Sequence, residues 1–285
     1  MPLLIFGATG QVATELRARC PQARVLSRSE ADLADPEACA ARIADLAPEA
    51  VINAAAYTAV DRAEEEETLA TVINADAPAA MARACAAQAI PFVHISTDYV
   101  FDGAGEAPFA PDAPVAPLGA YGRSKLAGER GVTEAGGVHA ILRTSWVFSA
   151  HGTNFLKTML RLGAERDELR IVADQIGGPT PAGAIAEACL AITAQLSEDP
   201  AKRGIYHFAG APDVSWAGFA REIFAAAKLD CAVTDIPSTD YPTPARRPLN
   251  SRLDTSATEA RFGIARPDWR AAVQEIIAKL QSDPA

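Results

Sequence analysis

The sequence PLLIFGATGQVA, at residues 2–13, joins an apolar run to a glycine turn and then to a helical pattern. The run at 2–6 predicts a buried strand, and a helix is expected from about residue 10 to residue 20. Gly7 and Gly10 permit a tight turn and a close approach of the backbone, and the N-terminus of a helix favours a pyrophosphate. A strand before and a helix after are the context that a dinucleotide-binding turn requires, with a plain strand–helix connection as the alternative.

Apolar runs alternate with helical patterns through the rest of the first half of the chain. Further strands are expected at 23–27, 50–56, 91–95 and 139–148, and helices from Pro36, at 61–88 and at 119–131. Such alternation implies right-handed crossovers and a parallel sheet. The predicted fold class is therefore α/β, with a doubly wound, Rossmann-like parallel sheet.

The second half is less regular, and we expect it to form a smaller C-terminal substrate-binding domain. The patterns predict helices near 154–164, 182–196, 215–228 and 268–281, and strands at 168–172 and 204–210. We expect residues 1–148 to form the NAD(P)-binding domain, 181–210 to return to its sheet, and 149–285 to bind mainly substrate. The proline-rich stretch at 236–254 is too long for a simple connection, and loops of that length are usually functional or disordered.

Composition restricts the class of protein. A 285-residue chain with 49% apolar residues can bury a sizeable core, and its net charge of −10 argues against general nucleic-acid or membrane-surface binding. No stretch approaches the ~18 apolar residues of a membrane span, and the N-terminus lacks the pattern of a signal peptide. Five cysteines without a CxxC pair indicate a reducing compartment, and the four histidines show no metal-ligand spacing. We expect a cytoplasmic protein whose chemistry needs no metal.

The residues that follow the second strand bear on cofactor choice. NAD sites usually place an acid there to bind the ribose 2′-hydroxyl. Here Arg28, between two serines, offers a cation for a 2′-phosphate, so we favour NADPH and expect that NADH is also accepted. The alternative for Arg28 is a solvated surface arginine. The GxxG spacing is similar to that of the short-chain dehydrogenase/reductase superfamily, whose members place a pair such as Asp32-Leu33 near the adenine.

Three polar residues predict the catalytic chemistry. Tyr121 and Lys125 are four apart on a predicted helix and share a face, and Thr97 ends a predicted strand. A free phenol titrates near ~10. A nearby ammonium and an oxidised nicotinamide would lower that pKa, so that Tyr121 protonates a carbonyl oxygen as hydride arrives. Lys125 can also bind the nicotinamide ribose, and Thr97 would orient the carbonyl; an ordinary surface pair is the alternative for Tyr121 and Lys125.

The run Thr97-Asp98-Tyr99 separates two branches of the superfamily that act on nucleotide sugars. Sugar 4,6-dehydratases have Thr-Asp-Glu there, so elimination lacks its second acid here, whereas ketone reduction does not need it. The chain resembles the dTDP-4-dehydrorhamnose reductase family over nearly its whole length. The matching runs are GATGQVATEL (7–16), NAAAYTAVDRAE (53–64), STDYVFDG (96–103), YGRSKLAGE (121–129), LRTSWVF (142–148), NF (154–155), DQIGGPT (174–180) and RRPLNSRL (246–253).

The resemblance implies reduction of the C4 ketone of dTDP-4-dehydro-L-rhamnose by NAD(P)H. The cofactor-binding residues that it implies, together with those argued above, are Gly7, Thr9, Gly10, Gln11, Val12, Arg28, Asp32, Leu33, Ala54, Ala55, Ala56, Tyr57, Tyr121 and Lys125. It implies that the dTDP-sugar contacts Trp146, Asn154, Phe155, Arg247 and Asn250. A core tryptophan is the alternative for Trp146, and a solvated loop arginine is the alternative for Arg247.

Three questions stay open at this point. Some members of the family dimerise through a metal held by carboxylates; Glu15 and Glu187 are suitably placed, but Gly183 removes a second carboxylate, so we expect no metal and leave a homodimer possible. Another nucleotide-sugar reductase or an epimerase would fit the same scaffold. A non-catalytic binding subunit, similar to the regulatory β subunit of methionine adenosyltransferase, is the alternative from another class.

Overall fold

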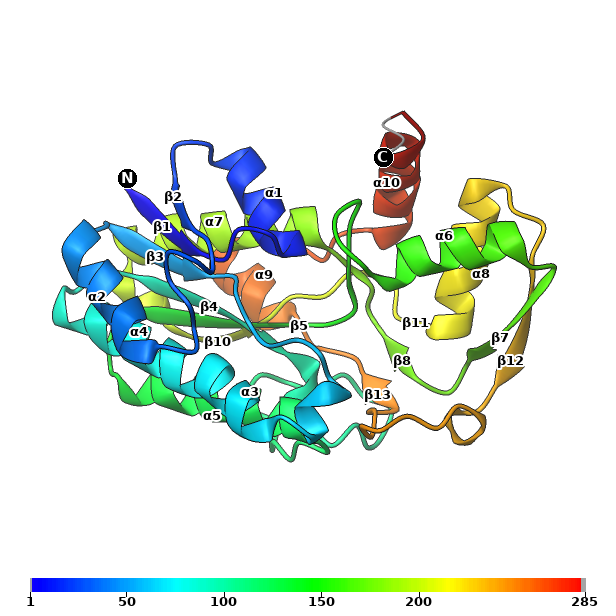
Figure 1. Cartoon of the computed structure of the whole chain (residues 1–285), viewed down its shortest axis with the longest axis horizontal. Helices are drawn as coiled ribbons and strands as arrows, with labels where there is room; N and C mark the ends of the chain where they lie inside the picture. Colours follow the sequence, from blue (N-terminus) through cyan, green and yellow to red (C-terminus); the bar gives the residue numbers. More distant parts are fainter. Residues whose placement is uncertain (1, 283–285) are drawn as a thin grey trace.

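The computed structural model describes residues 2–282, and a six-stranded parallel sheet forms the larger of two lobes (Figure 1). Its strands lie in the order β10-β5-β4-β3-β1-β2, and every neighbouring pair is parallel. Their bounds are Leu3–Phe6 (β1), Arg24–Leu26 (β2), Ala50–Asn53 (β3), Phe92–Thr97 (β4), His139–Thr144 (β5) and Gly204–His207 (β10). The predicted α/β class is confirmed. Strand order reverses between β1 and β3, which is where such sheets bind ligands.

Helices cover both faces of this sheet, as a doubly wound fold requires. One face is covered by α1 (Gln11–Arg19), α7 (Ala182–Glu198) and α9 (Ser256–Phe262), and the other by α2 (Pro36–Leu46), α4 (Ala77–Ala87) and α5 (Ala120–Glu134). Each face has its own apolar core, and the strands are buried on both sides, so their sequences are continuous apolar runs rather than alternating ones.

The predicted single helix at 61–88 is interrupted. A 3₁₀ turn covers Arg62–Glu64, and a helical stretch then runs through α3 (Glu67–Thr71), a π turn (Val72–Asp76) and α4. Within the π turn, Asn74 bonds both backbone groups of Tyr57, accepting from its N–H at 2.8 Å and donating to its carbonyl at 3.0 Å. This contact fixes the loop after β3, and side-chain periodicity could not reveal it.

The predicted strand at 139–148 is also shorter in the structure. β5 ends at Thr144, Trp146 has a φ of 48°, and the chain turns away from the sheet there. Val147–Phe148 (β6) then pairs with Thr180–Pro181 (β9) outside the main sheet. The prediction failed because an apolar run does not show where a backbone turns.

The smaller lobe is built around a parallel pair of strands, β7 (Glu168–Val172) and β12 (Ala232–Ile236). Helices α6 (Phe155–Glu165), α8 (Trp216–Ala227) and α10 (Trp269–Ser282) pack around an aromatic core that contains Phe219 and Trp269. A three-stranded sheet of β11 (Val214–Ser215), β8 (Ile176–Gly177) and β13 (Asn250–Ser251) lies between the lobes. The strands β12 and β13 and the helix α9 were not predicted from the sequence.

All five cysteines are free and buried. Across residues 2–282, none of the helices combines the length and apolar character needed to cross a membrane.

Candidate active site

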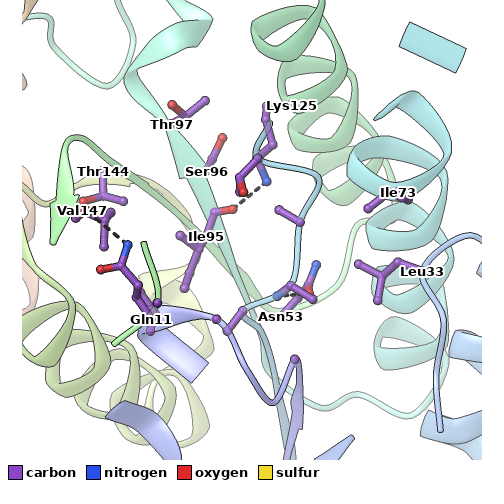
Figure 2. A pocket seen from close by; sticks show the side chains of 18 of the residues that line it. Gln11, Leu33, Asn53, Ile73, Ile95, Ser96, Thr97, Lys125, Thr144 and Val147 are labelled. Atoms are coloured by element: carbon purple, nitrogen blue, oxygen red, sulfur yellow. Dashed lines mark hydrogen bonds between the residues drawn. The ribbon is translucent and has the colours of Figure 1, made fainter. Parts of the chain in front are cut away.

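A cleft of about 690 Å³ opens at the carboxyl ends of β1, β3, β4 and β5 (Figure 2). It therefore lies at the point of the sheet where the strand order reverses. Most of the predicted catalytic and cofactor-binding residues line it. These are Gly7, Thr9, Gly10, Gln11, Val12, Arg28, Asp32, Leu33, Ala54, Ala55, Ala56, Thr97, Tyr121 and Lys125, and the predicted substrate residue Trp146 joins them.

The glycine turn forms one wall of the cleft and fits a pyrophosphate. Gly7 has a φ of +103°, and a Cβ built there would lie 3.2 Å from the carbonyl carbon and oxygen of Ala54. Helix α1 begins at Gln11 with Gly10 as its N-cap, so no side chain caps its first amides and its first turn carries no acid. Amides left free at a helix N-terminus are donors for an anion.

Arg28 lies at the rim of the cleft, just after β2. Its side chain is 79% exposed, and Nε donates to Asp32 Oδ2 over 3.2 Å. The Ala34 amide and the Arg28 guanidinium together hold the pKa of Asp32 below its usual range. An exposed pair of this kind contributes little to stability, so the guanidinium can exchange partners at small cost.

Tyr121 and Thr97 meet inside the cleft. A hydrogen bond from the Thr97 hydroxyl acts to lower the pKa of Tyr121, but burial dominates and raises it to about 12. The Asp98 carboxylate acts in the same direction as burial. The lowered pKa expected from the sequence applies to the complex with an oxidised nicotinamide, and for that complex it stays a prediction. The Nζ of Lys125 has other partners: it donates to Ile95 O at 2.8 Å (Figure 2), and it lies 3.1 Å from His94 Nε2.

Burial also affects Lys125, whose side chain is among the largest that are fully enclosed. Burial lowers its pKa to about 8, although the Glu129 carboxylate acts in the opposite direction. Glu129 is itself paired with Arg143 at 2.7 Å, and both side chains are only 3% exposed. The lysine is therefore close to its titration point near neutral pH.

Two polar atoms in the cleft are buried without a hydrogen-bond partner among the described residues: Asp98 Oδ2 and Thr144 Oγ1. Unsatisfied buried polar atoms cost free energy, so they indicate a site for a polar ligand. Sequence reasoning considered Asp98 only as the retained acid of the Thr-Asp-Glu run, in which Tyr99 replaces the glutamate, and it did not consider Thr144. Asp98 follows the strand predicted at 91–95 and so had a signal in the sequence, whereas Thr144 lies inside the strand predicted at 139–148 and had none.

Trp146 borders the cleft and is held by the smaller lobe. Its ring stacks on that of Trp216 with the centroids 3.6 Å apart and the planes 11° from parallel. Gly177 completes the contact, because a Cβ there would lie 2.9 Å from Trp146 Cε2. The tryptophan is therefore neither a core residue nor a freely moving one.

Five predicted contacts lie outside the cleft lining: Tyr57, Asn154, Phe155, Arg247 and Asn250. Tyr57 donates its hydroxyl to Glu66 at 2.5 Å. Phe155 packs against Trp216 and Phe219 in the core of the smaller lobe. These two side chains already have partners that belong to the fold.

Asn154 and Asn250 are also engaged. Asn154 caps α6 by accepting from Lys157 N at 3.1 Å, and its amide donates to Gln11 Oε1 at 3.0 Å. Asn250 is 2% exposed, donates to Ala107 O and accepts from Arg252. Asn154 thus reaches the cleft only through Gln11, and Asn250 holds together the segment in which it lies.

Arg247 forms a bidentate ion pair with Asp61, with Nη–Oδ distances of 2.8 and 2.9 Å. Asp61 also accepts from the Ala245 amide, so this carboxylate joins the loop after β3 to the proline-rich segment. The hydrogen bonds from Arg247 are the main reason that the pKa of Asp61 is lowered. The sequence indicated a cationic segment around Arg247, but nothing in it indicated that Asp61 is the partner of this arginine.

The carboxylates considered as metal ligands have a different partner. Glu15 and Glu187 both bind Arg19, the latter at 2.9 Å, and a Cβ at Gly183 would contact the same guanidinium. Within residues 2–282, no group of three or more His, Cys, Asp or Glu side chains is arranged to hold a metal ion.

Asp98→Asn is expected to raise the melting temperature by several degrees at pH 8 and to change it little at pH 4. Burial raises the pKa of Asp98 to about 6, partly offset by the Ser251 and Thr97 hydroxyls. The folded state therefore holds this proton more tightly than the unfolded state, so stability falls as pH rises from about 4 to about 6 and stays lower above that. At about 1.4 kcal/mol per pKa unit, the ionised group costs up to about 3 kcal/mol. Calorimetry at both pH values measures the difference, and an equal shift at both would show that charge is not its cause.

Comparison with known proteins places the chain among nucleotide-sugar reductases. The profile of a family described as "RmlD substrate binding domain" matches residues 1–282. A Burkholderia thailandensis protein named dTDP-4-dehydrorhamnose reductase is 46% identical, over 99% of this chain and 100% of its own length. A crystal structure of a dTDP-4-dehydrorhamnose reductase from Clostridium acetobutylicum superposes with a TM-score of 0.91 at 35% identity, covering 99% of this chain and all of the other. The Bacillus anthracis reductase, solved in complex with NADP, gives a TM-score of 0.89 at 32% identity, covering 98% and 100%.

Proposed function

The chain belongs to the RmlD substrate-binding-domain family, and from this we propose that it is a dTDP-4-dehydrorhamnose reductase. It would reduce the C4 ketone of dTDP-4-dehydro-L-rhamnose to give dTDP-L-rhamnose. The observation that carries the proposal is the meeting of Thr97, Tyr121 and Lys125 in one cleft whose glycine turn fits a dinucleotide. Dinucleotide binding is assigned to the larger lobe, and the sugar nucleotide to the side that the smaller lobe completes.

The proposed cofactor is NADPH, with NADH also accepted, and when bound it supplies the hydride for the ketone carbon. The Gly7–Gly10 turn and the first amides of α1 would hold its pyrophosphate, and Arg28 would hold the 2′-phosphate. The NADP complex of the Bacillus anthracis relative supports this choice. The net charge of −10 supports small-molecule partners rather than nucleic acid, and the five free cysteines support a cytoplasmic location.

Tyr121 acts as the general acid in this proposal. Burial keeps its phenol protonated at every physiological pH, which is the state that a proton donor requires. The phenolic proton passes to the ketone oxygen, while the Thr97 hydroxyl orients that oxygen. Lys125, one turn further along α5, offsets the negative charge that Tyr121 then carries.

Substrate contacts are reassigned in part from the packing. Asp98 and Thr144 have free acceptor capacity inside the cleft and are proposed to bind sugar hydroxyls, with Trp146 against the ring. Arg247 remains the proposed diphosphate ligand. Its guanidinium already fits one bidentate oxygen pair, that of Asp61, so the diphosphate would take the place of that carboxylate.

The test of function is a reduction assay with the purified protein, dTDP-4-dehydro-L-rhamnose and NADPH. Loss of absorbance of the reduced nicotinamide, together with dTDP-L-rhamnose as the product, would support the proposal. A different sugar product would indicate another reductase. Tight binding of both ligands without turnover would favour the non-catalytic subunit.

Arg28→Ala is expected to weaken NADPH binding by about one to two decades and NADH binding much less. Only NADPH carries the 2′-phosphate, and a charge-assisted hydrogen bond is worth roughly 1.5–3 kcal/mol. Dissociation constants for both cofactors, measured by titration calorimetry, give the comparison. Arg24→Ala is the matched control, since Arg24 begins β2, pairs with Glu30 and does not line the cleft. Equal weakening of both cofactors by Arg28→Ala would make Arg28 a structural residue.

A further inference from the structure

His94 lies in β4, three residues before Thr97, and has no part in the chemistry proposed above. It is fully buried, and both of its ring nitrogens face polar atoms. Nε2 lies 3.1 Å from Lys125 Nζ, and Nδ1 lies 3.2 Å from Asn53 Nδ2. A row of hydrogen bonds therefore runs from the end of β3, through β4, to the lysine on α5.

The direction of these hydrogen bonds follows from the end of the row. The Ala55 amide can only donate, and it donates to Asn53 Oδ1 at 3.1 Å. This contact fixes the Asn53 side chain so that its NH₂ group faces His94 Nδ1. An amide nitrogen is a donor, so Nδ1 must accept, and a neutral imidazole then carries its hydrogen on Nε2. His94 is neutral, because burial holds its pKa well below its usual range.

Nε2–H therefore points at Lys125 Nζ. An ammonium has three donors and no lone pair, whereas an amine can accept one hydrogen bond and still donate two. The other hydrogen bond of Nζ, to Ile95 O at 2.8 Å, is satisfied by either form. We propose that His94, oriented by Asn53, is a positioning residue for Lys125 that donates a hydrogen bond to Nζ and so favours the uncharged amine.

The groups that surround Lys125 do not fix its charge. On α5, Tyr121 and Glu129 lie one turn to either side of Lys125, and Glu129 is bound by Arg143 of β5 and by Ser96 of β4. The facing residue on β3 is the uncharged Asn53. Between residues 72 and 87, which include α4, the buried polar side chains comprise only Asn74, which is uncharged. Burial has already brought the pKa of Lys125 to about 8, so one donor is enough to change its charge near neutral pH.

The consequence for catalysis rests on the proposed function. After Tyr121 has given its proton to the ketone oxygen, the ammonium of Lys125 is the proton source on the same helix: an N–H bond breaks on Nζ, the proton passes through water, and an O–H bond forms on the phenolate. The resulting amine accepts the Nε2–H hydrogen bond and later regains a proton from water. A group whose pKa lies near the working pH serves best in such a transfer.

The first test needs no substrate. Nitrogen NMR of the free protein, labelled with ¹⁵N-histidine, reports the tautomer of His94 at pH 7.5, and His94→Leu identifies its signals among those of four histidines. The expected tautomer has the hydrogen on Nε2. A hydrogen on Nδ1, or an imidazolium, would overturn the proposal; if His94→Leu does not fold, replacing each of the other three histidines in turn identifies the His94 signals by elimination.

The second test is the sign of a pH shift. In His94→Leu the donor to Nζ is lost, so the alkaline limb of kcat/KM and of the NADPH dissociation constant should move upward by about one pH unit. A downward shift would mean that Nε2 accepts from the ammonium, and no shift would mean that His94 only fills space; either result contradicts the proposal. His139→Leu is the control, because His139 is a buried histidine at the opposite end of the sheet and should leave both limbs in place. If the protein reduces no sugar but His94 carries Nε2–H, the proposed function fails and the hydrogen-bond assignment stands.

Discussion

Replacing Tyr121 by phenylalanine is expected to lower kcat by about 10²–10⁴-fold, the usual contribution of a positioned general acid. The ring stays in place, because it packs edge-on against Tyr99 with the centroids 5.5 Å apart, and only the hydroxyl is removed. The ketone oxygen then loses its proposed proton donor. Single-turnover kinetics with saturating NADPH and sugar measures the loss directly.

The control for this variant is Tyr206→Phe. Tyr206 is also buried, and its hydroxyl donates to Lys202 O at 2.5 Å, but it lies on β10 away from the cleft. It should lose stability comparable to that lost by Tyr121→Phe and keep its kcat. A kcat for Tyr121→Phe within threefold of the unchanged protein would remove Tyr121 from the mechanism, and weaker NADPH binding alone would give it a cofactor role instead.

The second large effect is expected from Gly7→Ala. The new methyl group would require an alanine at a φ of +103° and would lie 3.2 Å from two backbone atoms of Ala54 and from Ala55 Cβ. Backbone strain of this kind costs roughly 1–3 kcal/mol. Relief of the contact would displace the turn that faces the pyrophosphate, so NADPH affinity should fall by about tenfold or more.

Gly105→Ala separates strain from contact. Gly105 also has a positive φ, of +75°, but nothing lies within 4 Å of a Cβ built there. Gly105→Ala should therefore lower the melting temperature and leave NADPH affinity unchanged, whereas Gly7→Ala should lower both the melting temperature and the NADPH affinity. If the two variants bind NADPH equally well, the turn at Gly7 does not hold the cofactor.

Much of the larger lobe could be predicted from the sequence, because its strands are buried on both faces and, along the chain, helices alternate with them. Short continuous apolar runs such as 2–6 and 91–95 are typical of strands that are buried on both faces of a parallel sheet. The glycine turn and the Tyr121–Lys125 spacing are local features, and both lie where the parallel sheet brings its strand ends together. Local periodicity was less informative where contacts between residues far apart in the chain set the backbone conformation, as at the π turn held by Asn74 and the break in the strand at Trp146.

The chemistry of the site depends on contacts that no sequence pattern contains. The residues Thr97, Tyr121 and Lys125 could be chosen by type and spacing, but not the charge that each would carry. Burial raises the pKa of Tyr121 and lowers that of Lys125, and it leaves one oxygen of Asp98 without a partner among the described residues. Arg247 looked like a free cation until folding brought Asp61 to it across 186 positions of the chain. The pattern of residue types was therefore enough to predict the fold class and to propose a set of reactive side chains, whereas their electrostatics depend on desolvation and long-range pairing, which exist only after packing.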